Sequence, residues 1–161
     1  MGEKMSKKIY IISIIIFIID QISKVIISTY MSLNETIRII KNFFYLTYTN
    51  NTGASFGILK NNRILLIILS IIAIIIIIRY INSFKNTKNN ILGLSFLMGG
   101  IIGNLADRIL FGYVRDFFNF YIIGYDFPIF NIADIFIVLG VFILIISIIR
   151  GEDTNVSKSR K

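Results

Sequence analysis

The sequence predicts an integral membrane protein of mainly α structure, with four transmembrane helices and a small extracytoplasmic β-platform. Of the 161 residues, 55% are hydrophobic, and the chain contains four long apolar segments. A run of about 20 consecutive apolar residues is long enough to cross the core of a bilayer. Basic residues collect at alternate ends of these segments. A stretch rich in aromatic and β-branched residues follows the first segment, and this composition is typical of strands.

The spans are predicted at about residues 9–31, 64–81, 91–111 and 131–149, within one membrane domain of residues 1–150. The first span could instead be a cleavable signal peptide, because Lys7 and Lys8 precede it. However, Asp20 and Lys24 interrupt its apolar run, and no small-x-small cleavage site follows. We therefore interpret it as a transmembrane helix.

Charge placement predicts the orientation. Ten of the seventeen basic residues lie at or near the N-terminus, the 82–90 loop and the C-terminal tail: Lys4, Lys7, Lys8, Arg79, Lys85, Lys88, Arg150, Lys158, Arg160 and Lys161. Cytoplasmic segments carry such an excess, so both termini and the polar tail 151–161 are predicted to be cytoplasmic, with residues 32–63 and 112–130 outside. The net charge of +8 does not indicate a nucleic-acid partner, because there is no basic stripe with interleaved aromatics on a soluble module.

The two outer loops differ in character. Phe43–Thr49 is rich in aromatic and β-branched residues and predicts a strand, and the following "NNTG" predicts a turn, so residues 32–63 are expected to form the platform. The second loop contains an aromatic hairpin, Phe117–Phe130, which is expected to lie in the membrane interface, where aromatic rings are favoured.

Two carboxylates, Asp116 and Asp134, are the most informative residues for function. The chain has no His and no Cys, which excludes the usual nucleophile–base pairs and soft-metal sites. Asp134 is the fourth residue of the last predicted span, within roughly 6 Å of the outer boundary, and Asp116 follows the third span at the same level. Ionisable residues at such positions are functional candidates. Alternatively, Asp134 only stabilises the first turn of a helix, and Asp116 is an exposed loop residue paired with Arg115.

Other polar residues in the spans are expected to support this pair. Asp20 and Lys24 stand four residues apart on one helix face, and we interpret them as a structural ion pair in which Lys24 extends toward the outer boundary. Gly99 and Gly103 form a small-xxx-small pattern that predicts close helix packing.

The outer part of the third span contains Asn104, Asp107 and Arg108. Arg108 can clamp a carboxylate or a backbone carbonyl, and Asp107 and Arg108 are expected to support the site from behind. The segment "NTGASFG" (residues 51–57) offers an amide side chain and a glycine backbone that a ligand can approach. The same residues are also ordinary turn chemistry.

Four motifs together carry a family resemblance: "DQISK" (20–24), "NTGASFG" (51–57), "GGIIGNLADRILFGYVRDFF" (99–118) and "FNIADIFIVLG" (130–140). In this order and spacing, residues 8–150 resemble the bacterial lipoprotein signal peptidases, the signal peptidase II family. The resemblance implies an aspartic endopeptidase of the bacterial cytoplasmic membrane, with its site toward the outer face. Such enzymes remove signal peptides from prolipoproteins, on the amino side of a diacylglyceryl-modified Cys.

The resemblance also implies residue roles. Asp116 and Asp134 match the catalytic pair, and the supporting positions are Asp20, Lys24, Asn51, Gly53, Asn104, Asp107, Arg108 and Asn131. Ser55 stands where many members carry Ala. Two neighbouring carboxylates share one proton, so one activates water while the other polarises the scissile carbonyl, and Asp134 is expected to be the anion because a helix N-terminus favours it. The expected partners are lipid-modified prolipoproteins and membrane lipid, with no cofactor, no metal and a monomeric enzyme.

From the residues alone, other classes of protein remain possible. A proton-coupled transporter could use the same acids, although its key carboxylate is expected near the midplane, and a membrane scaffold would leave the embedded charges unexplained. A Ser–Lys dyad of Ser23 and Lys24 is excluded because helix neighbours point about 100° apart, whereas Ser55 with Lys24 is not. Carboxylates and amides can also hold Mg²⁺ in a lipid phosphatase.

Overall fold

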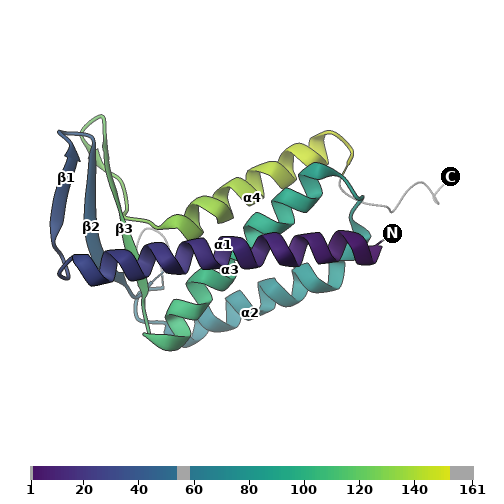
Figure 1. Cartoon of the computed structure of the whole chain (residues 1–161), viewed down its shortest axis with the longest axis horizontal. Coiled ribbons are helices and arrows are strands. Elements are labelled where there is room, and N and C mark those ends of the chain that lie inside the picture. The colour runs from purple at the N-terminus through teal and green to yellow at the C-terminus, as the bar shows by residue number, and fades with distance from the viewer. Residues whose placement is uncertain (1, 54–58, 153–161) are drawn as a thin grey trace.

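Four helices form a bundle with a β-sheet at one end (Figure 1). This computed structural model describes residues 2–53 and 59–152. The helices are α1 (Gly2–Tyr30), α2 (Arg63–Tyr80), α3 (Lys88–Leu110) and α4 (Ile132–Ile149), and a short 3₁₀ helix, η2 (Ile81–Ser83), follows α2. All four α-helices are long and apolar enough to cross a membrane. The predicted fold class is therefore confirmed, although α1 begins at Gly2, well before the expected start of the first span.

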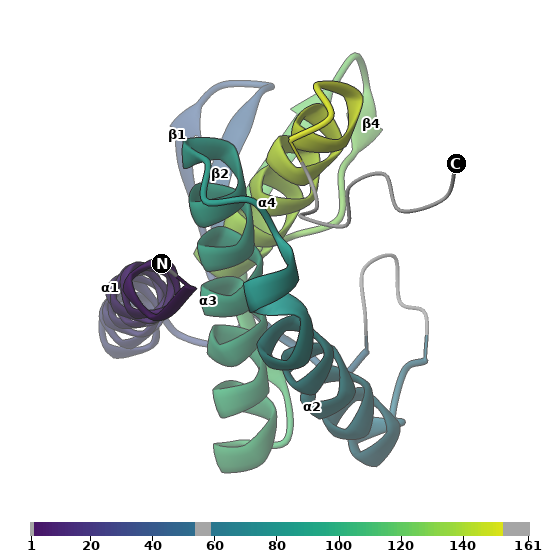
Figure 2. The same ribbon diagram turned by 90° about the vertical axis from the view of Figure 1, so that its right-hand side faces the viewer.

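The third helix occupies the centre of the bundle. It packs against α1, α2 and α4, whereas α2 and α4 scarcely touch each other and diverge on the same side of it (Figure 2). Half of its apolar stretch is buried, against about a fifth for each of the other helices. This central position explains why α3 can carry polar side chains through the membrane region, since protein rather than lipid surrounds them.

Glycines on α3 allow its close contacts. A Cβ on Gly99 would lie 2.9 Å from the Ser13 carbonyl oxygen on α1, and one on Gly100 would lie 2.5 Å from the Ala133 carbonyl oxygen on α4. Both distances are too short for a real Cβ contact. The close packing predicted from the glycine pattern is confirmed, and it serves two neighbouring helices rather than one.

The sheet is antiparallel, with strand order β1-β2-β3-β4. Its strands are β1 (Thr36–Ile40), β2 (Phe44–Asn51), β3 (Val114–Ile122) and β4 (Tyr125–Asp126). The strand predicted at Phe43–Thr49 lies almost entirely within β2. However, the platform extends beyond residues 32–63, because the aromatic hairpin supplies β3 and β4. Stacking of Phe44 on Phe120, with ring centroids 4.6 Å apart, helps to join the two halves.

Candidate active site

Asp116 is buried where the sheet meets the helix bundle. It lies on β3 opposite Thr49 of β2, and only 1% of its surface is exposed. Asn51 Nδ2 donates a hydrogen bond to its Oδ2 at 2.9 Å, and Asn131 Nδ2 donates to its Oδ1 at 2.6 Å. The alternative of an exposed loop residue paired with Arg115 is therefore wrong, because the extended strand turns neighbouring side chains to opposite faces.

Asp134 lies in the first turn of α4, where the free backbone N–H groups favour a carboxylate. Its Oδ2 accepts from the backbone N–H of Asn131 at 3.2 Å, and Asn131 Oδ1 accepts from the Asp134 N–H at 3.1 Å, which makes a reciprocal capping box. Asn104 Nδ2 donates to its Oδ1 at 2.8 Å. Asp134 therefore stabilises the first turn of its helix, as the alternative interpretation predicted. It also faces a cavity.

A single residue, Asn131, links Asp116 to Asp134. The buried side chain of Asn131 donates to Asp116 and accepts from the backbone of Asp134, and its Nδ2 also lies 3.1 Å from Asn104 Oδ1. Since every polar atom of this side chain is used, Asn131 can adopt only one orientation. The geometry of the pair is therefore set by the protein before any ligand enters.

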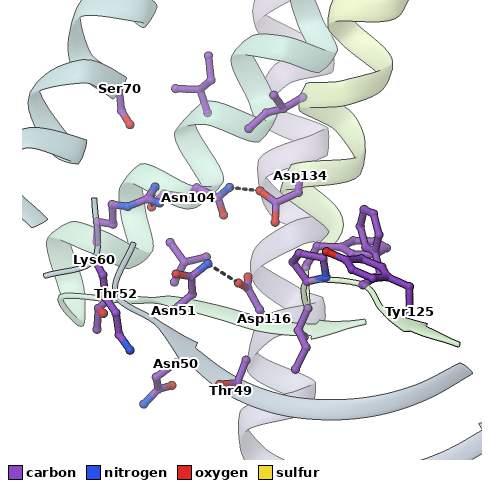
Figure 3. A pocket seen from close by; sticks show the side chains of 18 residues that line it. Thr49, Asn50, Asn51, Thr52, Lys60, Ser70, Asn104, Asp116, Tyr125 and Asp134 are labelled. Atoms are coloured by element: carbon purple, nitrogen blue, oxygen red, sulfur yellow. Dashed lines mark hydrogen bonds between the residues drawn. The ribbon is translucent and has the colours of Figure 1, made fainter. Parts of the chain in front are cut away.

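Asp116 and Asp134 line one cavity of about 770 Å³ (Figure 3). Asp116 reaches it from β3 and Asp134 from α4, and in the figure both side chains point into the same space. The wall on one side of the pair is polar and includes Asn50, Thr52 and Lys60. Among the described residues, no group of three or more acidic side chains comes together that could hold a metal ion.

The environment of Asp116 favours its protonated form. Burial, and then the facing carboxylate of Asp134, raise the pKa of Asp116 to about 7, against the opposing hydrogen bonds from Asn51 and Asn131. Asp134 receives donors from Asn104 and from the start of α4. Near neutral pH, Asp116 can therefore carry a proton beside the Asp134 side chain and act as a proton donor.

Arg108 lines this cavity and brings a positive charge to it. Its Nη2 donates to the Gly53 carbonyl at 3.0 Å, and its Nη1 lies 3.4 Å from the Asn104 carbonyl, so it clamps backbone as expected. Its buried Nε has no hydrogen-bond partner among the described residues. Asn51 Oδ1 accepts from the Gly53 N–H at 2.9 Å, so one turn holds both Asn51 and the carbonyl that Arg108 binds.

A second polar network lies behind the cavity. Lys24 Nζ is 2.9 Å from Asp20 Oδ2, 3.5 Å from Asp107 Oδ2 and 3.0 Å from Asn104 Oδ1. The predicted ion pair of Asp20 and Lys24 is confirmed. The expectation that Lys24 extends toward the outer boundary is wrong: its side chain is fully buried, because two carboxylates and an amide surround it in the core.

This network is tied to the carboxylate pair at two points. Asn104 accepts from Lys24 and donates to Asp134. Asp20 Oδ1 accepts from the Ala133 N–H at 3.0 Å, next to Asp134 in the first turn of α4. Gly103 makes room for Asp20, since a Cβ there would lie 2.5 Å from its Oδ2. Asp20 thus acts as a second cap on the helix that carries Asp134.

Two further residues of this network were not predicted as supporting residues. Arg115 donates to Asp107 through its backbone N–H, its Nε and its Nη2, at 3.0, 3.2 and 2.8 Å, and its Nη2 also reaches Gln21 Oε1 at 3.1 Å. Arg115 therefore neutralises Asp107 instead of Asp116 and fixes the start of β3. Its position beside Asp116 was the only sequence signal, and that signal suggested the wrong partner.

The serine alternatives have different outcomes. Ser23 Oγ donates to the Asp20 carbonyl at 2.6 Å, while Lys24 is engaged elsewhere, in accord with the exclusion of that dyad. Ser55, along with the rest of residues 54–58 of the "NTGASFG" motif, lies outside the described residues. The same holds for residues 153–161 of the predicted tail.

Fold and site together define a class: a multi-pass membrane protein with a carboxylate pair in a cavity at one end of its helices. A family model for signal peptidase (SPase) II matches residues 12–150. The chain therefore belongs to the signal peptidase II family, and hydrolase activity of the aspartic class follows from that membership.

Individual relatives agree with this assignment. The lipoprotein signal peptidase of Clostridioides difficile (strain 630) is 40% identical over 153 residues, which cover 94% of this chain and 99% of the relative. That of Brevibacillus brevis is 42% identical over 147 residues, covering 91% and 97%. A solved bacterial membrane enzyme, crystallised by the in meso method, superposes with a TM-score of 0.83 at 33% identity and covers 95% of this chain and 93% of its own.

Proposed function

We propose that this enzyme removes signal peptides from diacylglyceryl-modified prolipoproteins, cutting on the amino side of the lipidated Cys, with Asp116 and Asp134 as its catalytic pair. The observation that carries the assignment of the pair is their convergence on one cavity, linked by the Asn131 amide. The names of the relatives support lipoprotein precursors as the substrate class.

The protonation state of the pair supports a direct attack by water. Asp134 takes a proton from a water molecule between the carboxylates, and the water oxygen attacks the scissile carbonyl carbon. Asp116 gives its proton to the carbonyl oxygen, which becomes a hydroxyl of the tetrahedral intermediate. When the C–N bond breaks, Asp134 passes its proton to the leaving amine and Asp116 recovers one from the hydroxyl. The starting state is thereby restored without an acyl-enzyme.

Residues around the pair can hold the substrate main chain. Arg108 lines the cavity and its Nε–H has no partner in the described part of the chain, and Asn51 places its amide against Asp116. A peptide held by such groups has its scissile carbonyl at a fixed distance from the attacking water. The attack is then effectively unimolecular, because the entropy of bringing the two reactants together has already been lost on binding. Because all these groups come from one chain, we propose a monomeric enzyme.

We propose that the cavity opens toward the outer face of the bacterial cytoplasmic membrane and that both termini are cytoplasmic. The sheet lies at the end of the bundle opposite the start of α1 and the end of α4 (Figure 1). Basic residues concentrate at the terminal end, which the positive-inside tendency places in the cytoplasm: Lys4, Lys7, Lys8, Arg79, Lys85, Lys88 and Arg150. Membrane lipid would then surround the apolar helix faces and reach the cavity between α2 and α4.

The test is cleavage of a diacylglyceryl-modified prolipoprotein by the purified wild type, Asp116→Asn and Asp134→Asn, each with and without EDTA. Asp126→Asn is a matched control, because Asp126 is an exposed carboxylate on β4. We expect cleavage by the wild type and the control in EDTA, and loss of at least a thousandfold in both other variants with folding retained. Near-normal activity of either variant would refute the assignment of the pair, and an inert wild type would refute the proposed substrate.

A further inference from the structure

Ser70 is a polar exception in an apolar helix. Residues 64–78 of α2 are Ile and Leu except for Ser70 and Ala73. Ser70 faces the cavity of the carboxylate pair, and Figure 3 shows its hydroxyl directed toward that space. Its Oγ donates to the Leu66 carbonyl at 2.9 Å, the usual back-bond of a serine within a helix. The hydroxyl is therefore satisfied when the cavity is empty and is available when a better acceptor enters.

The helix residues that line the cavity near Ser70 are apolar. Ile101 of α3 and Ile137 of α4 line the same end, at the place where α2 and α4 diverge. Figure 3 shows Ser70 at one end of the cavity and Asn50 at the other, with Asp134 and Asp116 at an intermediate level. Ser70 is thus a hydrogen-bond donor beside isoleucine side chains at its end of the cavity.

The depth of Ser70 follows from the helix positions. Arg63 Nε and Nη2 donate to the Arg108 and Ile109 carbonyls at 2.8 and 2.9 Å, so the start of α2 is level with the last turn of α3. Ser70 and Ile101 are each seven residues further inward, or roughly 10 Å. Asn104, which holds Asp134, is three residues from Ile101. Ser70 therefore lies roughly 5 Å inward of the catalytic pair.

This depth suits one part of the proposed substrate. In a diacylglyceryl cysteine, six bonds separate the Cα atom from the first ester carbonyl carbon, and an extended chain advances by about 1.25 Å per bond once bond angles are included, so the carbonyl can reach up to roughly 7–8 Å from the backbone, which includes the depth of Ser70. An ester carbonyl at that depth is surrounded by isoleucine side chains and loses its contact with water. A polar group in such surroundings is costly unless it is hydrogen-bonded.

We propose that Ser70 is a specificity-determining residue that donates a hydrogen bond to a glyceryl ester carbonyl of the substrate. This inference rests on the proposed function. The hydroxyl gives up the Leu66 carbonyl, which keeps its own helical partner, and binds the ester. The lipid-bearing cysteine is thereby held with its scissile bond at the carboxylate pair, and ester-linked lipid is preferred over a chain of the same length without the carbonyl.

The test compares two substrates that share one peptide, one with a diacylglyceryl and one with a dialkylglyceryl group on the Cys. Wild type, Ser70→Thr and Ser70→Val are assayed for kcat/KM on both, because Thr and Val have the same shape and differ only in the hydroxyl. We expect wild type and Ser70→Thr to prefer the diacyl substrate about threefold to tenfold. Ser70→Val is expected to lose this preference while it cuts the dialkyl substrate as well as Ser70→Thr does.

Ser28→Ala is the control for loss of a helix hydroxyl elsewhere, because Ser28 is half-buried on α1, does not line the cavity, and its Oγ donates to the Val25 carbonyl. It should keep the wild-type preference. An equal preference in wild type and Ser70→Val would overturn the inference and leave the proposed function intact. If the wild type cuts neither substrate, the proposed function fails and the role of Ser70 fails with it.

Discussion

Replacement of Asp116 by Asn should change the pH dependence of stability in a defined direction. Burial and the Asp134 carboxylate raise the pKa of Asp116 from 3.8 to about 7 in the folded protein. The native state therefore binds this proton more tightly than the unfolded chain does, and the wild type loses stability as pH rises from about 4 to about 7. An Asn at this position has no proton to lose, so the variant lacks this decline.

The magnitude follows from the two pKa values. Between pH 5 and pH 8, about two units of the shift are traversed, which corresponds to about 3 kcal/mol at 1.36 kcal/mol per unit. Asn also loses something at every pH, because its NH₂ faces the amide donor of Asn51 or Asn131, at a cost of about 1–3 kcal/mol. We therefore expect Asp116→Asn to be less stable than wild type at pH 5 and equal or more stable at pH 8.

The assay is thermal unfolding in detergent micelles at half-unit steps from pH 5 to pH 8. For a chain of this length, 3 kcal/mol corresponds to a change of about 6–12 °C in the Tm difference between variant and wild type. Asp126→Asn, at an exposed carboxylate, serves as the control and should show a constant difference. A Tm difference for Asp116→Asn that does not vary with pH would show that burial of this carboxylate has no energetic consequence.

Further predictions concern rate and packing. The value of kcat/KM should fall above an apparent pKa near 7, because the carboxylate pair then loses its shared proton; a flat pH–rate profile up to pH 9 would contradict this. Asn131→Ala removes the amide between the carboxylates and should lower kcat about a hundredfold, measured under saturating substrate, and an unchanged kcat would contradict the role of this amide. Gly103→Ala places a Cβ 2.5 Å from Asp20 Oδ2 and should lower the Tm by several degrees together with activity; an unperturbed Tm would show that Asp20 can move freely. Arg63→Gln loses two bonds to the end of α3 and should destabilise the protein by about 1–2 kcal/mol in thermal unfolding, whereas Lys60→Gln should not.

Short-range patterns determined much of the architecture. Apolar runs of span length predicted the four helices, and aromatic and β-branched composition predicted β2, because these properties depend on residues near one another in the chain. The pairing of β3 with β2 was not predictable in the same way. These strands are separated by two helices, and their register depends on how those helices cross.

The ion-pair partners of the charged residues show most clearly what could and could not be predicted from the sequence. Asp20 and Lys24 are one helical turn apart, and their ion pair could be predicted from spacing alone. Arg115 stands next to Asp116 in the chain but pairs with Asp107, since a strand turns adjacent side chains to opposite faces.

By itself, the sequence determined a four-helix membrane protein of the signal peptidase II family, two informative carboxylates and the polar residues expected around them. Only the tertiary structure decided that Asp116 and Asp134 share one cavity, that Asn131 links them and that Lys24 lies in the core rather than at the boundary. The physical reason is that the two kinds of feature depend on interactions over different separations along the chain. Helix formation and membrane burial depend on local composition, whereas hydrogen-bond partners inside a bundle depend on the approach of helices and strands distant in the chain.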